Sequence, residues 1–415
     1  MSTTTPERPT SPRHRRLRRL LLALYLFAAF ADATGKAVAA NPAANAALAR
    51  LVHGARAAEL REARRPSGNF EIFRASSRHL LAGTDLYAQY ATEQDRFKYS
   101  PTFALLFAPL AFLAWPLALF LWSTLNAVAL LLALERLLPP RAALLAGALL
   151  LLELLRAMQN AQSNALVAAL IIFAFLAVEE GRSWRAGVLV ALGASIKIFP
   201  LAALTFALPR RRATRTGVAA LAAGVGVALL PLLVTPPATL VAQYRSWRGI
   251  EATDAQQRWF SIMELLHHWT GLSLPNWPVQ LAGVVLLTLP LALRRRRWPE
   301  ARFRLVYLCS VLLFVALFNH QAERASYVIA FTGATIWFVS SPREKWRTLL
   351  YGLALLTIPV ASTLVPGAWL KLPDVVLYRL AFPTLLVWLA LQAELWARDP
   401  APAPASRTDV MPARP

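Results

Sequence analysis

Long apolar segments recur along the whole chain and alternate with short polar ones. A helix needs about 20 residues to cross a bilayer core of roughly 30 Å, and many of these segments reach that length. The pattern predicts an all-α polytopic membrane protein with about 10–12 transmembrane helices. The predicted spans lie near 18–38, 101–135, 141–157, 163–180, 185–208, 215–235, 278–293, 302–318, 325–340, 347–365 and 375–396.

Composition and charge give these helices an orientation. The 415 residues are 57% hydrophobic, with a mean hydropathy of +0.46, yet 44 Lys plus Arg oppose 22 Asp plus Glu, for a net charge of +22. A chain this apolar is not a soluble globular protein. Nucleic acid is not an expected partner, because the arginines do not follow one polar face. The positive-inside rule predicts that the basic clusters are cytoplasmic, namely those at 15–19, 209–215, 294–297 and 343–347.

This orientation places both termini in the cytoplasm. We expect a basic N-terminus over 1–17, a membrane domain over 18–396 and a disordered Ala/Pro-rich tail over 397–415. An even number of spans then requires one apolar segment to divide. Division of 101–135 at Trp115-Pro116 gives about 12 spans, and a re-entrant break around Lys197 to Pro200 is the alternative.

Two long segments are predicted outside the membrane, in the loops 41–100 and 236–278. Apolar and arginine side chains alternate at helical spacing over 44–66, which predicts an amphipathic helix on the membrane surface. A second helix is expected over 70–81, ending at Gly83. The later loop carries amphipathic side chains suited to the membrane interface, which are Tyr244, Trp247, Trp259 and Trp269.

Lys197 is the first candidate for chemistry, because it lies near the middle of an apolar segment. An ionisable side chain at membrane depth is costly and usually faces a cavity. Anion binding is one interpretation, and pairing with a carboxylate for packing is the other. The carboxamides Gln159, Asn160, Gln162 and Asn164 form a second group, able to bind sugar hydroxyls or phosphate or simply to cap a helix.

Two further groups lie at predicted external mouths of the helices. The first group consists of Asp85 and Tyr87, followed by Lys98 and Tyr99. An aspartate in a loop either stabilises a turn or serves as a catalytic carboxylate. The later group comprises Asn319, His320, Glu323 and Arg324. It could act in acid/base chemistry or bind phosphate, and the alternative interpretation is a polar turn between two helices.

Several motifs are missing from the sequence. It contains no DxD, GxxxxGK[ST], HExxH or GxSxG pattern, and its one cysteine, Cys309, lies in an apolar segment. These absences argue against a soluble nucleotide-sugar enzyme with bound Mg²⁺ and against ATP-driven transport. No metal and no cofactor is expected.

Taken in order, these segments resemble the integral-membrane GT-C glycosyltransferases, and among them the DUF2029 or glycosyltransferase family 87 group, which includes polyprenyl-phosphomannose-dependent mannosyltransferases. The resemblance runs from the first helix to about residue 340. Tyr-Ser-Pro stands where the family usually has Tyr-Pro-Pro. The resemblance is carried by Asp85-x-Tyr87, Tyr99-Ser100-Pro101, the carboxamides from Gln159 to Asn164, Lys197-x-x-Pro200 and Asn319-His320.

The resemblance implies transfer of a sugar, a hexose such as mannose, from a polyprenyl-phosphate donor to a lipid or glycan acceptor at the extracytoplasmic face of a bacterial cell membrane. Asp85 would be the general base of an inverting reaction, and His320 a second catalytic residue. Lys197, Lys98 and Arg324 are candidates for binding the donor phosphate. The remaining predicted substrate-binding residues are Tyr99, Glu323 and the four carboxamides.

A secondary transporter or a lipid-linked sugar flippase is the alternative, with Lys197 in its substrate site. A transporter does not need a 60-residue external segment with surface helices, and it usually shows related halves. A membrane scaffold is a third interpretation. The sequence itself identifies neither the sugar nor the acceptor.

Overall fold

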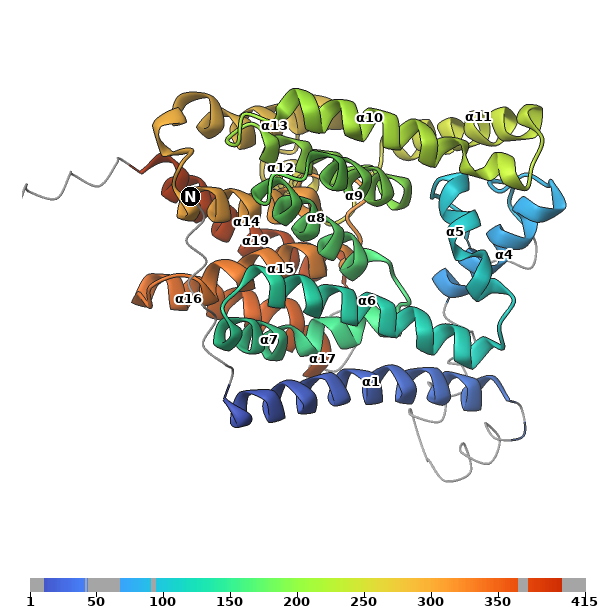
Figure 1. Ribbon diagram of the computed structural model, residues 1–415, viewed down its shortest axis with the longest axis horizontal. Coiled ribbons are helices and arrows are strands. Elements are labelled where there is room, and N and C mark those ends of the chain that lie inside the picture. Colours follow the sequence, from blue (N-terminus) through green and yellow to red (C-terminus); the bar gives the residue numbers. More distant parts are fainter. Residues whose placement is uncertain (1–10, 42, 44–67, 91–94, 365–371, 398–415) are drawn as a thin grey trace, which may run out of the picture.

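The computed structural model describes residues 11–41, 43, 68–90, 95–364 and 372–397. All regular elements within these ranges are helices, which confirms the all-α prediction (Figure 1). Together with the apolar spans given next, they make the chain an all-α polytopic membrane protein. The predicted surface helix over 44–66 lies outside the described residues. In order, the first elements are α1 (Pro12–Ala40), α4 (Gly68–Ala82), α5 (Pro101–Ala111), α6 (Trp115–Leu137), α7 (Pro140–Gln159), α8 (Asn164–Glu179), α9 (Ser183–Ile196), the 3₁₀ helix η1 (Phe199–Ala207) and α10 (Ala213–Leu229).

The remaining elements complete the bundle. They are η2 (Leu230–Leu233), α11 (Pro237–Asp254), α12 (Ile262–Thr270), α13 (Asn276–Leu293), η3 (Arg295–Arg297), α14 (Ala301–Leu317), η4 (Arg324–Ser326), α15 (Tyr327–Val339), α16 (Lys345–Leu355), the π-helical turn η5 (Leu356–Val360), α17 (Ala361–Leu364) and α19 (Pro373–Trp396).

Six described helices are long and apolar enough to cross a membrane. They are α1, α6, α7, α10 with η2, α13 and α19. The other predicted spans form shorter or interrupted helices, and α8, α14 and α15 are apolar on almost every face and buried by their neighbours. Helices α6, α7, α13 and α19 pack against these three, whereas α1 packs on α6 and α7, and α10 packs on α9.

Both predicted breaks are present. The segment 101–135 divides between Ala111 and Trp115, and the segment 185–208 divides at Lys197. The expectation that the first division yields two spans is wrong for α5: at 1.5 Å per residue its 11 residues extend only about 16 Å. Pro101 and Pro116 each occupy the first turn of a helix, where a missing N–H costs nothing.

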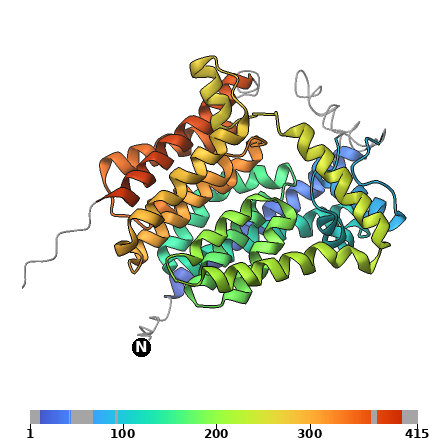
Figure 2. The same cartoon turned by 90° about the horizontal axis from the view of Figure 1, so that it is seen from above.

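The bundle has two chemically distinct ends. The beginning of α1 and the end of α19 lie together at one end, on the left of Figures 1 and 2, whereas α4, α5 and α11 gather at the other. We call the first the basic end, because the arginine clusters of the loops lie there, and the second the site end. Helix α4, which the sequence predicts over 70–81, and helix α11, which forms part of the loop predicted over 236–278, both belong to the site end.

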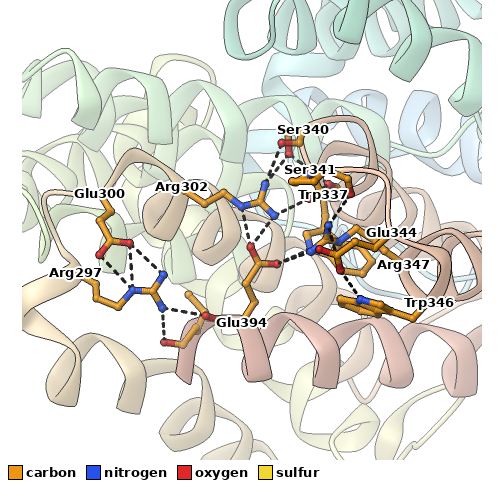
Figure 3. A network of polar contacts seen from close by, with 12 residues as sticks. Arg297, Glu300, Arg302, Trp337, Ser340, Ser341, Glu344, Trp346, Arg347 and Glu394 are labelled. Atoms are coloured by element: carbon orange, nitrogen blue, oxygen red, sulfur yellow. Dashed lines mark hydrogen bonds and ion pairs between the residues drawn. The ribbon is translucent and has the colours of Figure 1, made fainter. Parts of the chain in front are cut away.

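Carboxylates shared between arginines connect the helices at the basic end. Glu394 of α19 accepts hydrogen bonds from Arg302 (2.8 Å) and Trp337 (2.9 Å) and lies 3.7 Å from Arg347 (Figure 3). Glu179 of α8 joins Arg210 and Arg304 in the same way, at 3.0 Å and 2.9 Å. The Glu394 network ties four helices together, α14, α15, α16 and α19, and the Glu179 network ties three chain segments.

An aromatic cluster fixes α4, α5 and α6 at the site end. Phe73 of α4 meets Tyr99 and Phe103 edge to face, each at 5.0 Å between ring centroids. The buried Arg74 donates to the carbonyls of Ala111 and Leu113, which the end of α5 leaves without helical partners. Helix α4 ends at Gly83, whose φ of +69° suits glycine, as the sequence predicts.

We expect Glu394→Gln to destabilise the protein by roughly 2 kcal/mol or more, because it leaves two partly buried arginines without their carboxylate. Thermal unfolding of the purified protein in detergent measures this loss. Glu135→Gln is the matched control, since the exposed pair of Glu135 with Arg18 contributes less than about 1 kcal/mol. Equal effects of the two substitutions would contradict a central role for Glu394.

Candidate active site

A cavity of about 360 Å³ lies at the site end, between the break after α9, the face of α11 and the turn that precedes α15. It combines basic, acidic, amide and aromatic side chains. The lining residues are Asn69, Ile72, Asp95, Arg96, Lys98, Tyr99, Ile196, Lys197, Ile198, Phe199, Tyr244, Trp247, Arg248, Glu251, Gln257, Trp259, Asn319, His320, Gln321 and Glu323. Five of the predicted site residues therefore meet in one place, although they come from distant segments: Lys98, Tyr99, Lys197, His320 and Glu323.

The break after α9 positions Lys197. Pro200 has no N–H to continue the helix, and Lys197 has extended backbone angles (φ −144°, ψ 142°). Ser100 donates its hydroxyl hydrogen to the carbonyl of Ser195 at 2.6 Å and also accepts from the N–H of Phe103. Ser100 thereby caps α5 and fixes it to the broken end of α9.

The Lys197 ammonium faces the cavity over the ring of Tyr99, with 5.9 Å between Nζ and the ring centroid. Within the described residues it forms no ion pair and no hydrogen bond; the nearest charge acting on it is that of Glu323. A cation without a bonded partner in a cavity wall suits an anionic ligand. The alternative interpretation is a packing pair with a carboxylate, but no carboxylate among the described residues bonds to Lys197.

A hydrogen-bond chain connects three predicted residues across the cavity. The hydroxyl of Tyr99 donates to Gln162 Oε1 at 3.3 Å, and Gln162 Nε2 donates to Glu323 Oε2 at 3.0 Å. Gln162 is buried, while Glu323 is exposed to the cavity. These hydrogen bonds hold Oε2 of Glu323 and leave its Oε1 available to a substrate.

Lys98 is paired, in contrast to Lys197. Its Nζ lies 2.9 Å from Asp254 Oδ2, and Gln257 and Gln321 donate to the same carboxylate at 2.9 Å and 3.3 Å. Burial lowers the pKa of Lys98, but the bond to Asp254 and the charges of Asp95 and Glu323 outweigh it, so the net pKa is raised. Lys98 stays protonated, and Asp254 is fully engaged.

His320 presents a hydrogen-bond donor. Gln280 Nε2 donates to the carbonyl of Phe318 at 3.2 Å and lies 3.1 Å from His320 Nδ1, so Nδ1 accepts and Nε2 carries the proton. His320 Nε2 is buried without a partner among the described residues. Burial lowers the pKa of the imidazole, and the nearby Asp254 offsets only part of this. The ring is therefore neutral at pH 7, with Nδ1 as the acceptor and Nε2–H as a donor that faces no partner among the described residues.

Helix α11 supplies residues that the sequence analysis did not identify as site residues. Tyr244, Trp247, Arg248 and Glu251 follow at i, i+3, i+4 and i+7 and share the helix face that lines the cavity. This mixed aromatic and charged periodicity is the signal that could have revealed them. Burial raises the pKa of Glu251, while hydrogen bonding to Trp247 partly counters the shift.

Asp85 lies outside the residues that line the cavity. Its Oδ1 accepts from the N–H of Tyr87 at 3.0 Å, and its Oδ2 accepts from Ser246 at 3.2 Å, on a face of α11 turned away from the cavity. Tyr87 in turn donates its hydroxyl hydrogen to the carbonyl of Tyr99 at 2.8 Å. The role of Asp85 as base stays a prediction, and its observed contacts attach the 83–90 loop to α11.

The other predicted residues occupy the surroundings of the cavity. The carbonyl of Gln159 accepts from Lys36 at 2.7 Å, and that of Asn160 accepts from Asn69 at 3.1 Å. The Asn160 side chain donates to the carbonyl of Arg156 and so caps α7. Asn164 is buried at the beginning of α8, without a side-chain partner in the described ranges. Arg324 follows Glu323 but is not among the residues that line the cavity.

The model of glycosyltransferase family 87 matches residues 97–319, more than half of the chain. The chain belongs to glycosyltransferase family 87. It is therefore a membrane glycosyltransferase, and the resemblance seen in the sequence is confirmed. The match includes Lys98, Lys197 and the face of α11, but begins after Asp85 and ends just before His320. No curated protein matches the chain.

We expect Gln280→Glu to raise the pKa of His320 in this glycosyltransferase. A carboxylate beside Nδ1 accepts its proton and stabilises the imidazolium, whereas the native amide donates to Nδ1. NMR titration of the histidine rings, assigned with His320→Gln, measures the change. An unchanged titration of His320 would contradict the tautomer inferred from the Gln280 contact, and Gln257→Glu is the matched control.

Proposed function

We propose that this glycosyltransferase transfers a hexose, such as mannose, from a polyprenyl-phosphate donor to a hydroxyl group of a lipid or glycan acceptor. The observation that carries this proposal is the unpaired Lys197 in a cavity that also holds carboxylates, amides and aromatic rings. The ammonium suits a phosphate, and the amides and rings suit the hydroxyls and apolar face of a sugar. The cavity volume falls within the roughly 300–1,000 Å³ of small-molecule sites.

The proposed chemistry is a direct displacement. The acceptor oxygen attacks the anomeric carbon, the bond from that carbon to the phosphate oxygen breaks, and the acceptor proton passes to a carboxylate. A phosphate leaving group needs little protonation, so one carboxylate suffices and the anomeric centre inverts. Lys197 and the Nε2–H of His320 would stabilise the charge that develops on the phosphate.

Two carboxylates are candidates for the base. The family resemblance suggests Asp85, and the geometry favours Glu251, because Glu251 lines the cavity and its raised pKa makes it a stronger base than an ordinary glutamate. Asp85 already accepts two hydrogen bonds outside the lining. Glu323, held by Gln162, would orient a sugar hydroxyl.

We further propose that the cavity opens on the extracytoplasmic side of a bacterial cell membrane, with both termini in the cytoplasm. The arginine clusters at the opposite end support this orientation through the positive-inside rule. A lipid-linked donor would then reach the cavity from the bilayer.

The function is tested by incubating membranes that contain the protein with radiolabelled polyprenyl-phosphate hexoses and analysing the labelled lipids and glycans. Transfer of label to a new lipid or glycan is the expected result. Labelled donor that crosses the membrane without transfer would instead identify a flippase.

We expect Glu251→Gln to lower kcat about 10²- to 10⁴-fold, the usual contribution of a general base, and Asp85→Asn to lower it far less. The raised pKa of Glu251 means that its ionised form opposes folding above pH 4.5, so the neutral glutamine leaves stability at pH 7 unchanged or higher. Transfer kinetics and thermal unfolding measure both effects. A larger loss of kcat in Asp85→Asn than in Glu251→Gln would identify Asp85 as the base.

We expect Lys197→Met to raise the KM for the donor about tenfold or more, because it removes the cation from the cavity and keeps the length of the side chain. Donor titration of the transfer rate measures KM. Lys345→Met, at the exposed beginning of α16, is the control. A donor KM equal to that of the unmodified enzyme would exclude contact between Lys197 and the phosphate.

A further inference from the structure

Three arginines meet inside the bundle beside the cavity but outside its lining. Arg156 comes from α7, Arg324 from η4 and Arg379 from α19. One buried carboxylate, Glu153 of α7, interacts electrostatically with all three, yet within the described residues none of them forms an ion pair with it. Three positive charges and one negative charge leave the group with a net charge of +2. We call these four residues the arginine cluster.

The guanidinium groups of the arginine cluster are incompletely bonded. Arg379 is only 7% exposed; its Nη1 donates to the Thr357 carbonyl at 3.2 Å and to the Ser362 hydroxyl, but its Nε and Nη2 have no partner in the described part of the chain. Arg324 Nε is also buried without a partner there. Arg156 donates to the carbonyl of Ser362. Three buried guanidinium nitrogens thus remain available as donors among the described residues.

This arrangement differs from the arginine networks that stabilise the fold. At the basic end, Glu394 and Glu179 each bond directly to two arginines. In the arginine cluster the cations outnumber the carboxylate and repel one another. A buried charge without a counterion costs several kcal/mol. A purely structural role does not account for two surplus charges, whereas an anionic ligand would balance them.

The position of the arginine cluster indicates the kind of anion. Glu323 lines the cavity and Arg324 follows it directly, so the cluster adjoins the cavity. Two of its arginines belong to α7 and α19, helices long and apolar enough to cross the membrane. Thr357, which binds Arg379, lies in the π-helical turn η5, and such turns occur frequently at functional sites. The ligand therefore has an anionic group that reaches between membrane-spanning helices.

We propose that the arginine cluster binds the phosphate group of a membrane lipid, as a second phosphate site distinct from Lys197. Guanidinium groups bind phosphate oxygens through paired N–H donors, and Arg379 Nε and Nη2 form such a pair. The proposal goes beyond the proposed function, because it holds whichever sugar is transferred. A polyprenyl phosphate and an anionic phospholipid share this chemistry.

The test measures lipid binding by the full-length protein, purified in detergent and depleted of lipid. Thermal shift and native mass spectrometry are carried out with polyprenyl phosphate, phosphatidylglycerol and, as a lipid without phosphate, diacylglycerol. We expect a phosphate lipid to raise the unfolding temperature and diacylglycerol to have no effect. Arg379→Gln should weaken the binding about ten- to a hundredfold, and Arg324→Gln should weaken it as well.

The control substitution is Arg296→Gln, which removes an exposed arginine at the basic end and should bind like the unmodified protein. Without lipid, Arg379→Gln should unfold at or above the temperature of the unmodified protein, because it reduces repulsion. A lower temperature would identify Arg379 as structural and overturn the proposal. Arg379→Lys, which keeps the charge but loses the paired donors, should bind better than Arg379→Gln and worse than the unmodified protein.

The lipids distinguish the two sources of phosphate. Binding of polyprenyl phosphate that is weakened by Arg379→Gln assigns the arginine cluster to the donor or its product, and the same result with phosphatidylglycerol assigns it to a bilayer lipid; either supports the site. Equal binding by Arg379→Gln and the unmodified protein, or no preference over diacylglycerol, overturns it. Because no sugar transfer is measured, failure of the proposed function would leave these results unchanged.

Discussion

The break in the chain after Ile196 is the constraint on which the site depends. Pro200 cannot donate to the carbonyl four residues before it, so α9 ends inside the apolar region and frees backbone groups that hydrocarbon cannot bond. The hydroxyl of Ser100 satisfies the carbonyl of Ser195. This single contact fixes the segment that carries Lys98 and Tyr99 against Lys197, and so determines which cations share a cavity.

Charge is arranged differently at the two ends of the bundle. At the basic end the partly buried Glu394 and Glu179 each pair with two arginines, which makes these arginines part of the fold. At the site end, Lys197 and the arginine cluster have no bonded carboxylate among the described residues, while Lys98 is neutralised by Asp254. Because a fold gains little from unpaired buried cations, their presence at one end supports the proposal that anions bind there.

Local chemistry made much of the fold predictable from sequence. The lengths of the apolar segments gave the helices, and Trp115-Pro116, Pro200 and Gly83 gave their ends, because proline and glycine act on the backbone where they occur. The bonded partners were not predictable, since Gln162 and Glu323 are separated by 161 positions. The face of α11 escaped notice for the same reason: its side chains form a site only once the helix lies across the break.

The position of α11 also explains why an aspartate in the 83–90 loop can matter without touching the cavity. Gln243 accepts from the N–H of Leu86 and donates to the carbonyl of Thr84, and Asp85 accepts from Ser246 beside it. These contacts attach α11 to the loop, while the indole of Trp247 donates to the carbonyl of Lys98 at 3.3 Å on the cavity side. Helix α11 is thus fixed on two faces. Both sets of contacts are needed to keep the carboxylate of Glu251 at the cavity. The hydrogen bond that Asp85 accepts from Ser246 is part of this attachment, and it does not depend on the proposed role of Asp85 as a base.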